Sequence, residues 1–191
     1  ETAKDGTYTL PGHARQRFIF ITTPSGYKTL NKHYHKIDSR TNGYDFGLLT
    51  YHPGIGKDGS HQYVHVSDTE IFNTEGNEAW VRNIREYAAN ENAAFIIHTG
   101  DICYENGMKK HIKLMNTENM NVPVFYCIGN HDLVKGKYGE EVFENNYGPV
   151  YYSFDVANVH YIVTPMPGGD HKPGYTRLDV CRWLKNDLAH I

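Results

Sequence analysis

The sequence is short of cysteine, of net charge and of long apolar stretches, and each shortage excludes a class of protein. Its three cysteines, Cys103, Cys127 and Cys181, are too few and too scattered for a disulfide framework or a zinc knuckle, so we expect buried free thiols. The net charge of −3 provides no basic stripe that would neutralise a nucleic-acid backbone. No apolar run approaches the roughly 18 residues that a membrane-spanning helix needs.

The composition is otherwise that of a globular protein, with 39% apolar and 21% charged residues. A length of 191 residues allows one ordinary domain, or a small domain followed by part of a larger one. The chain begins at Glu1, without an initiator Met or a signal peptide, and we interpret this as a processed or excised start.

The first 58 residues have the pattern of β-structure and lack helical periodicity. Short runs of β-branched and aromatic residues alternate with turn signals such as Pro24-Ser25-Gly26. The expected strands are 7–10, 17–22, 34–37 and 45–51. A sheet this small must bury one face against another layer, so we expect it to pack on the following region. The glycine-rich stretch 53–60 is interpreted as a linker.

From His61 onward, short apolar strands alternate with amphipathic helices. The expected strands are 63–66, 94–98 and 123–128, and the expected helices are 78–90 and 109–119. This alternation implies a parallel sheet with crossover helices. A hairpin over 151–155 and 159–163 follows, and a final helix begins near Thr176. The expected inner face of that helix is Leu178, Cys181, Leu184 and Leu188.

Polar clusters follow all three parallel strands. They are Ser67-Asp68-Thr69-Glu70, Thr99-Gly100-Asp101 and Gly129-Asn130-His131-Asp132. In an open parallel sheet, ligands bind in the crevice beyond the carboxyl ends of the strands. The sheet should therefore bring Asp68, Asp101 and Asn130 to the same edge.

The residue types in these clusters suit hard divalent cations. Carboxylate and amide oxygens bind Mg²⁺ or Mn²⁺, and imidazole extends the range to Zn²⁺ and Fe. Two such ions can bridge a phosphate and lower the pKa of a shared water, and Asp101 on the middle strand is the natural bridging ligand. His131 points away from its neighbour Asn130, and suits binding to phosphate oxygens or protonation of the leaving group, with Asp132 fixing its tautomer.

These motifs, in this order and on these strands, resemble those of the calcineurin-like metallophosphoesterases. The resemblance covers 61–191 and implies an α/β fold, a partial four-layer αββα sandwich. It also implies a hydrolase of phosphate mono- or diesters that uses two divalent ions, Mn, Mg, Fe or Zn. Carried over by motif, Asp68 binds the first metal, Asp101 bridges, Asn130 binds the second, and His131 serves the leaving group with Asp132 behind it.

Residues 1–58 are similar to the small β-sandwich that precedes the catalytic domain in one bacterial, often exported branch of that family. The resemblance implies a partial all-β domain over 1–58 and the N-terminal part of the phosphoesterase domain over 59–191. It also implies an exported or periplasmic location.

Two departures from the family pattern open an alternative. Glu70 stands where the first motif usually has His, and is either a metal ligand that favours Mn²⁺ or Mg²⁺ or an ordinary solvated carboxylate. The family's downstream Gly-His and Gly-His-x-His motifs have no counterpart after Asn130. We therefore expect a chain that stops within the catalytic domain, is weakly active or inactive alone, and self-associates or binds the rest of its parent chain. The alternative is a degenerate module that binds protein or glycan.

The other histidines have plainer interpretations. We expect His98 to be a strand residue packed against a helix. His111 and His171 are expected at the surface, not among the metal ligands.

Overall fold

The computed structural model describes residues 2–12, 14–71, 77–102 and 104–191. The helices and strands are β1 (Phe18–Phe20), β2 (Tyr27–Thr29), β3 (Tyr34–Lys36), β4 (Leu48–Thr50), β5 (Val64–Val66), α1 (Asn77–Asn90), β6 (Ile96–His98), α2 (Glu105–Leu114), α3 (Thr117–Met120), β7 (Val124–Tyr126), α4 (Glu141–Tyr147), β8 (Tyr152–Val156), β9 (Val159–Val163) and α5 (Arg177–Leu188).

The expected parallel sheet is present, with its strands in the order β5-β6-β7. Val64 pairs with Ile96, and Ile96 pairs with Val124, so the three strands end at the same edge. Alternate side chains point to opposite faces of a strand. Ile96 and Val124 join the larger apolar cluster with the helices, whereas Phe95 and Phe125 join a second cluster with the β8-β9 hairpin.

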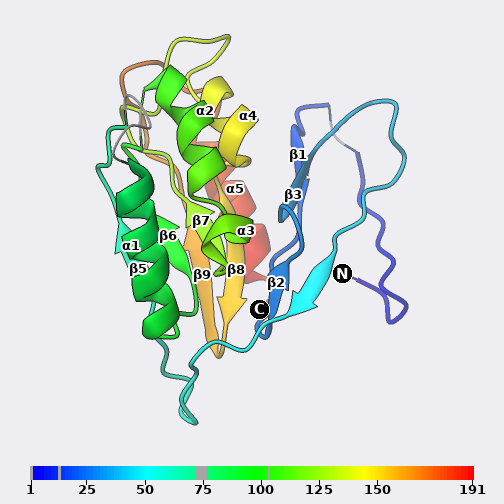
Figure 1. The fold of residues 1–191 in the computed structure, drawn as a ribbon. Coiled ribbons are helices and arrows are strands. Elements are labelled where there is room, and N and C mark those ends of the chain that lie inside the picture. The colour runs from blue at the N-terminus through cyan, green and yellow to red at the C-terminus, as the bar shows by residue number, and fades with distance from the viewer. Residues whose placement is uncertain (1, 13, 72–76, 103) are drawn as a thin grey trace.

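The layers follow from this alternation. Figure 1 shows α1, α2 and α3 on one side of the parallel sheet and the β8-β9 hairpin on the other, with α5 beyond the hairpin. Phe125 stacks on Phe154 of the hairpin with 3.6 Å between ring centroids. Ser153, on the opposite face of β8, hydrogen-bonds Asp187 of α5. This layering confirms the mixed α/β fold expected from the resemblance, and the antiparallel strands before it fit a β-domain.

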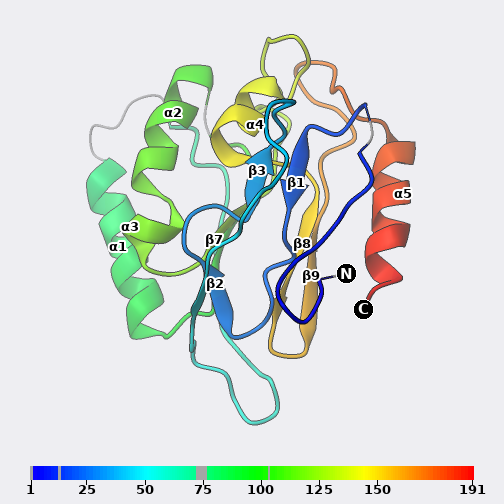
Figure 2. The same ribbon diagram turned by 90° about the vertical axis from the view of Figure 1, so that its right-hand side faces the viewer.

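The N-terminal strands form two small antiparallel pairs, β1-β3 and β2-β4. Figure 2 shows these strands in front of the β8-β9 hairpin, and Thr23 forms a parallel bridge to Phe154. The stretch 7–10, expected as a strand, is irregular. Tyr27–Thr29, which the sequence did not single out, pairs as β2. The division into two domains remains a prediction.

One expected helix differs from the structure, and one helix was not expected. The helix predicted over 109–119 is two helices, α2 and α3, because Asn116 interrupts it and caps α3 by accepting a hydrogen bond from the Asn119 N–H at 2.9 Å. Its short side chain competes with the helical backbone, which makes it a good N-cap residue. Helix α4 was not predicted from the sequence.

Of the four residues predicted for the inner face of α5, Leu184 is half-buried and the other three are exposed. Leu178 is 57% exposed and Leu188 is 51% exposed. The face turned inward instead presents Trp183, which packs on Phe20 and Tyr151. An aromatic ring has more area to bury than a leucine, so Trp183 sets the rotation of the helix.

The cysteines and the lengths of the helices can also be compared with the expectations. Cys127 is a free thiol whose pKa is raised to about 11 by burial, as expected for a buried cysteine. Cys181 is also free but exposed, against expectation, and Cys103 lies outside the described residues. In the part of the chain that the structure describes, no helix has the length and apolarity to cross a membrane.

Candidate metal centre

The three polar clusters lie together at the carboxyl edge of the parallel sheet, at the upper end of the molecule in Figure 1. Backbone hydrogen bonds extend the pairing of β5 and β6 into the loops. The Thr99 N–H donates to the Val66 carbonyl at 2.9 Å. The Asp68 N–H donates to the Gly100 carbonyl at 3.1 Å, and the Glu70 N–H donates to the Asp101 carbonyl at 3.2 Å. The first two clusters are therefore held side by side.

Three candidate ligands have left-handed backbone conformations. Asp68 has φ 54°, Glu70 φ 41° and Asp101 φ 50°. Only six non-glycine residues have positive φ in the described ranges, so half of them are at this edge. Such conformations cost energy and gather at functional sites, where the surrounding structure enforces them. The backbone thus supports the functional interpretation of these positions.

The second and third clusters touch through two glycines. A Cβ on Gly100 would overlap the backbone nitrogen of Gly129, and a Cβ on Gly129 would overlap the Asp101 carboxylate. Gly100 also has φ 102°, which only glycine adopts readily. Close approach lets the His131 N–H donate to Oδ1 of Asp101 at 3.1 Å. Asp101 therefore contacts both neighbouring loops.

His98 lies beneath the site and connects its first two loops. The Gly100 N–H donates to Nδ1 of His98 at 3.3 Å, so the ring proton is on Nε2. Nε2 is 3.0 Å from Oγ1 of Thr69, whose hydroxyl donates to the Ile102 carbonyl at 2.7 Å. Burial, with His111 and His65 nearby, lowers the pKa of His98 to about 3. His98 is thus a neutral, packed residue, as expected.

His111 is buried, which corrects its assignment to the surface. Its Nδ1 lies 2.9 Å from the Tyr147 hydroxyl, and burial lowers its pKa to about 4. The side of α2 that carries it packs against the rest of the fold, and the ring lies 5.5 Å from that of His98. His171 is exposed, as expected.

Asp132 is fully buried and accepts two backbone hydrogen bonds. Its Oδ1 accepts from the Ile102 N–H and its Oδ2 from the Gly129 N–H, both at 2.9 Å. These bonds join the loops after β6 and β7. The carboxylate on Nδ1 of His131 is instead Asp170, at 2.9 Å. The sequence expected Asp132 to fix the His131 tautomer, but the carboxylate in contact with the His131 ring is that of Asp170.

Asp170 was missed because it comes from the irregular segment between β9 and α5. Its N–H donates to the Asn130 carbonyl at 3.1 Å, which anchors the segment beside the third cluster. The only signal in the sequence was an acidic residue in a glycine-containing loop, Gly169-Asp170-His171. Such a residue is indistinguishable from an ordinary solvated carboxylate without the tertiary contact.

Nearby carboxylates favour the protonated form of His131. The hydrogen bond from the His131 ring to Asp170 raises the pKa of His131, and the nearby Asp101 and Glu70 carboxylates raise it further, against a smaller opposing effect of burial. The side chain is 40% exposed, so it is open to a ligand from solvent. His131 is therefore suited to act as a cationic hydrogen-bond donor at this edge.

The oxygen donors at the edge fit a hard cation in kind. Asp68 and Glu70 are exposed, and Asp101 and Asn130 are half-buried at the same sheet edge. Among the described residues, no three His, Cys, Asp or Glu side chains are grouped closely enough to hold a metal ion. The donors thus share an edge without forming a closed cage. Their chemistry is that of Mg²⁺ and Mn²⁺ sites.

Comparison with known proteins agrees with this site. A family model described as calcineurin-like phosphoesterase matches residues 61–186, well over half of the chain. The chain therefore belongs to the calcineurin-like phosphoesterase family, whose members generally use divalent metals. The search of curated proteins found no match.

Proposed function

We propose that this chain carries a metal-dependent site that hydrolyses phosphate monoesters or diesters. The observation that supports this most is the position of Asp101 between its neighbours. Its backbone carbonyl accepts from the Glu70 N–H, and its carboxylate accepts from the His131 N–H. These contacts on both sides support a role for Asp101 between two adjacent cations.

In this proposal, Asp68 would hold a first divalent ion, Asn130 would hold a second, and Asp101 would serve both. Glu70 adds a carboxylate where the family usually has His, and a more anionic site favours Mn²⁺ or Mg²⁺ over Zn²⁺. When bound, such ions neutralise phosphate charge and lower the pKa of the water that attacks phosphorus.

The remaining residues of the site bind phosphate oxygens, donate protons or hold the loops in place. His131, whose Nδ1 contacts the Asp170 carboxylate, donates to a phosphate oxygen or to the leaving-group oxygen. Asp132 supports this step indirectly, because its two backbone hydrogen bonds hold the loops that carry Asp101 and His131.

The test is metal binding and hydrolysis measured together. An aryl phosphate and the matching diester are offered with added Mn²⁺, to this chain and to a longer version extended at its C-terminus. Asp101→Asn keeps a residue that tolerates the left-handed backbone. It should lower kcat/KM by more than about a hundredfold, since losing even a group that orients a metal ligand costs 10–100-fold.

Asp58→Asn is the matched control, because Asp58 is exposed in the stretch 53–60 and bonds only locally to Ser60. It should leave both metal binding and turnover unchanged. If neither version of the chain binds Mn²⁺ or reacts, the site is degenerate, and a module that binds protein or glycan becomes the better interpretation.

A further inference from the structure

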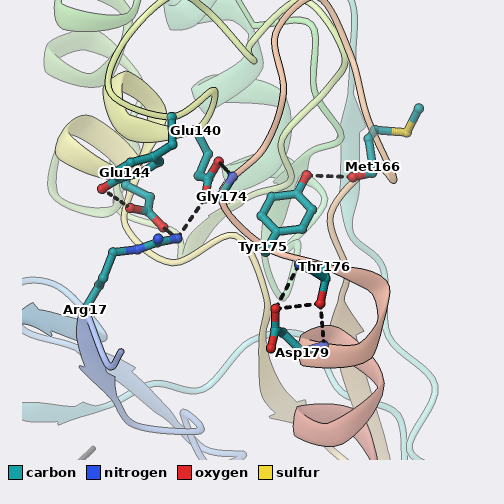
Figure 3. A network of polar contacts seen from close by, with 9 residues as sticks. Arg17, Glu140, Glu144, Met166, Gly174, Tyr175, Thr176 and Asp179 are labelled. Carbon is teal, nitrogen blue, oxygen red and sulfur yellow. Dashed lines mark hydrogen bonds and ion pairs between the residues drawn. The ribbon is translucent and has the colours of Figure 1, made fainter. Parts of the chain in front are cut away.

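An arginine from the N-terminal segment reaches two buried carboxylates near the candidate site. Nη2 of Arg17 lies 2.7 Å from Oε1 of Glu140 and 2.7 Å from Oε1 of Glu144 (Figure 3). The glutamate side chains are 0% and 2% exposed, and the arginine is 33% exposed. The guanidinium also lies 4.5 Å from the centre of the Tyr138 ring.

Buried carboxylates are costly unless a cation and hydrogen bonds compensate them. Burial raises the pKa of Glu144, and the attraction of Arg17 opposes that rise. Arg17 therefore supplies the cation that compensates the two buried carboxylates. Its position depends on the chain just before β1, which has no part in the parallel sheet.

Glu140 in turn holds the segment that leads into α5. Its Oε2 accepts from the Gly174 N–H at 2.8 Å, as Figure 3 shows. The neighbouring Gly139 N–H donates to the Lys172 carbonyl at 2.9 Å. A Cβ on Gly139 would lie 2.9 Å from that same carbonyl oxygen, so the two stretches are in close contact.

The segment 166–175 is closed on itself and rests on the third cluster. The Tyr175 hydroxyl donates to the Met166 carbonyl at 2.6 Å, joining the two ends (Figure 3). Near its middle, the Asp170 N–H donates to the Asn130 carbonyl, and the Asp170 carboxylate meets Nδ1 of His131. Because its two ends are joined, we expect a shift at Gly174 to reach Asp170 through this segment.

We infer that Arg17 is a positioning residue: it fixes the closed segment 166–175 through Glu140, so that Asp170 aligns the His131 ring. The consequence for catalysis rests on the proposed function, whereas the consequence for the position of His131 does not. The N-terminal segment is then a working part of the site, and its loss disturbs a histidine in a different layer of the fold.

The experiment compares Arg17→Gln with Arg17→Lys, which restores the cation, and with Arg40→Gln. Arg40 belongs to the same N-terminal segment but pairs with Asp38 at the surface. Amide hydrogen exchange of 166–175 and ¹⁵N-histidine NMR of the His131 ring are the readouts. Arg17→Gln should speed exchange by at least about tenfold, the effect of losing charge-assisted hydrogen bonds in a locally opening segment.

The His131 ring signals of Arg17→Gln should move toward those of Asp170→Asn, and Arg17→Lys should largely reverse both effects. Arg40→Gln should change neither. The inference is overturned if Arg17→Gln leaves the exchange or the ring signals as they are, or if Arg17→Lys fails to restore them. If Arg17→Gln does not fold, the double variant Arg17→Gln/Glu144→Gln, which removes one uncompensated carboxylate, decides by the same readouts.

Kinetics separate this inference from the proposed function. With an aryl phosphate and Mn²⁺, Arg17→Gln should lower kcat about tenfold and leave KM unchanged, since misplacement affects the chemical step more than binding. If even the unaltered protein is inactive, the proposed function fails, and the exchange and NMR results still decide whether Arg17 positions His131.

Discussion

The phosphoesterase part of the chain and the N-terminal strands differ in how they are stabilised. Residues after 60 supply all but one of the buried apolar side chains in the described ranges, and the exception is Tyr34 of β3. The N-terminal strands have three residues each and pair only two by two. Small sheets of this kind are marginal unless another layer covers them.

The N-terminal segment therefore obtains its order from the part that it covers. His33 is buried with its ring 4.6 Å from that of Tyr152, and the Tyr34 ring fills the space beside Gly148 that a Cβ would occupy. Helix α5 is similar, because none of its residues is fully buried. The molecule thus has a packed interior flanked by layers that depend on it.

The largest expected effect comes from the interior. Phe154→Ala should destabilise the fold by about 3–5 kcal/mol, because it leaves a cavity between the parallel sheet and the hairpin. Phe18→Ala, at a half-buried position of β1, should cost only about 1 kcal/mol. Urea unfolding of both variants measures the difference. Equal losses would show that the N-terminal strands belong to the same cooperative core.

Asp132→Ala should cost about 2–4 kcal/mol, because it leaves the buried Ile102 and Gly129 N–H groups without their acceptor. Asp132→Asn should cost less, since its amide oxygen still accepts from one of them. Chemical denaturation measures the loss of stability, and a loss of activity should accompany it. If Asp132→Ala is as stable as the unaltered protein, Asp132 does not hold the loops after β6 and β7 together.

Thr176→Ala should cost about 1 kcal/mol. Thr176 accepts from the Asp179 N–H, and the Asp179 carboxylate accepts from the Thr176 N–H, so the pair forms a capping box at the start of α5. Thr164→Ala is the control, because Thr164 is exposed and lies between β9 and α5. Thermal melting followed by circular dichroism checks both variants. An unchanged melting temperature of Thr176→Ala would mean that α5 adds little to global stability.

The smallest effect is a pH dependence centred on His160, which joins the hairpin to α5. Burial alone would lower its pKa, but hydrogen bonds to Asp187 and Asp155 outweigh burial and raise it. A raised folded-state pKa stabilises the fold below the unfolded value of about 6.5, and this stabilisation is lost as pH rises through the folded-state pKa.

Unfolding free energies should therefore fall by less than about 1 kcal/mol between pH 5.5 and 8.5 on account of this group. His160→Asn should flatten that part of the profile, whereas the exposed His171→Asn should leave it unchanged. Identical profiles for the unaltered protein and His160→Asn would show that the two carboxylates do not hold a charged imidazole.

The sequence by itself determined where the site is. Apolar alternation identified three strands, and each ends in a polar cluster that the chain carries in its local order. The carboxyl ends of parallel strands share one edge, so Asp68, Asp101 and Asn130 were placed together before any contact was known. Local pattern and a general rule of sheet geometry were sufficient for this.

Only the tertiary structure decided which groups support the site. Asp170 meets His131 across 39 residues, and Asp132 is buried, although both are acidic residues in loops with similar local signals. The face of α5 depended on Trp183, and the burial of His111 depended on what covers α2. The packing of the layers decides which distant segments touch and which polar groups are buried. The periodicity of side chains along one segment contains no information about that packing.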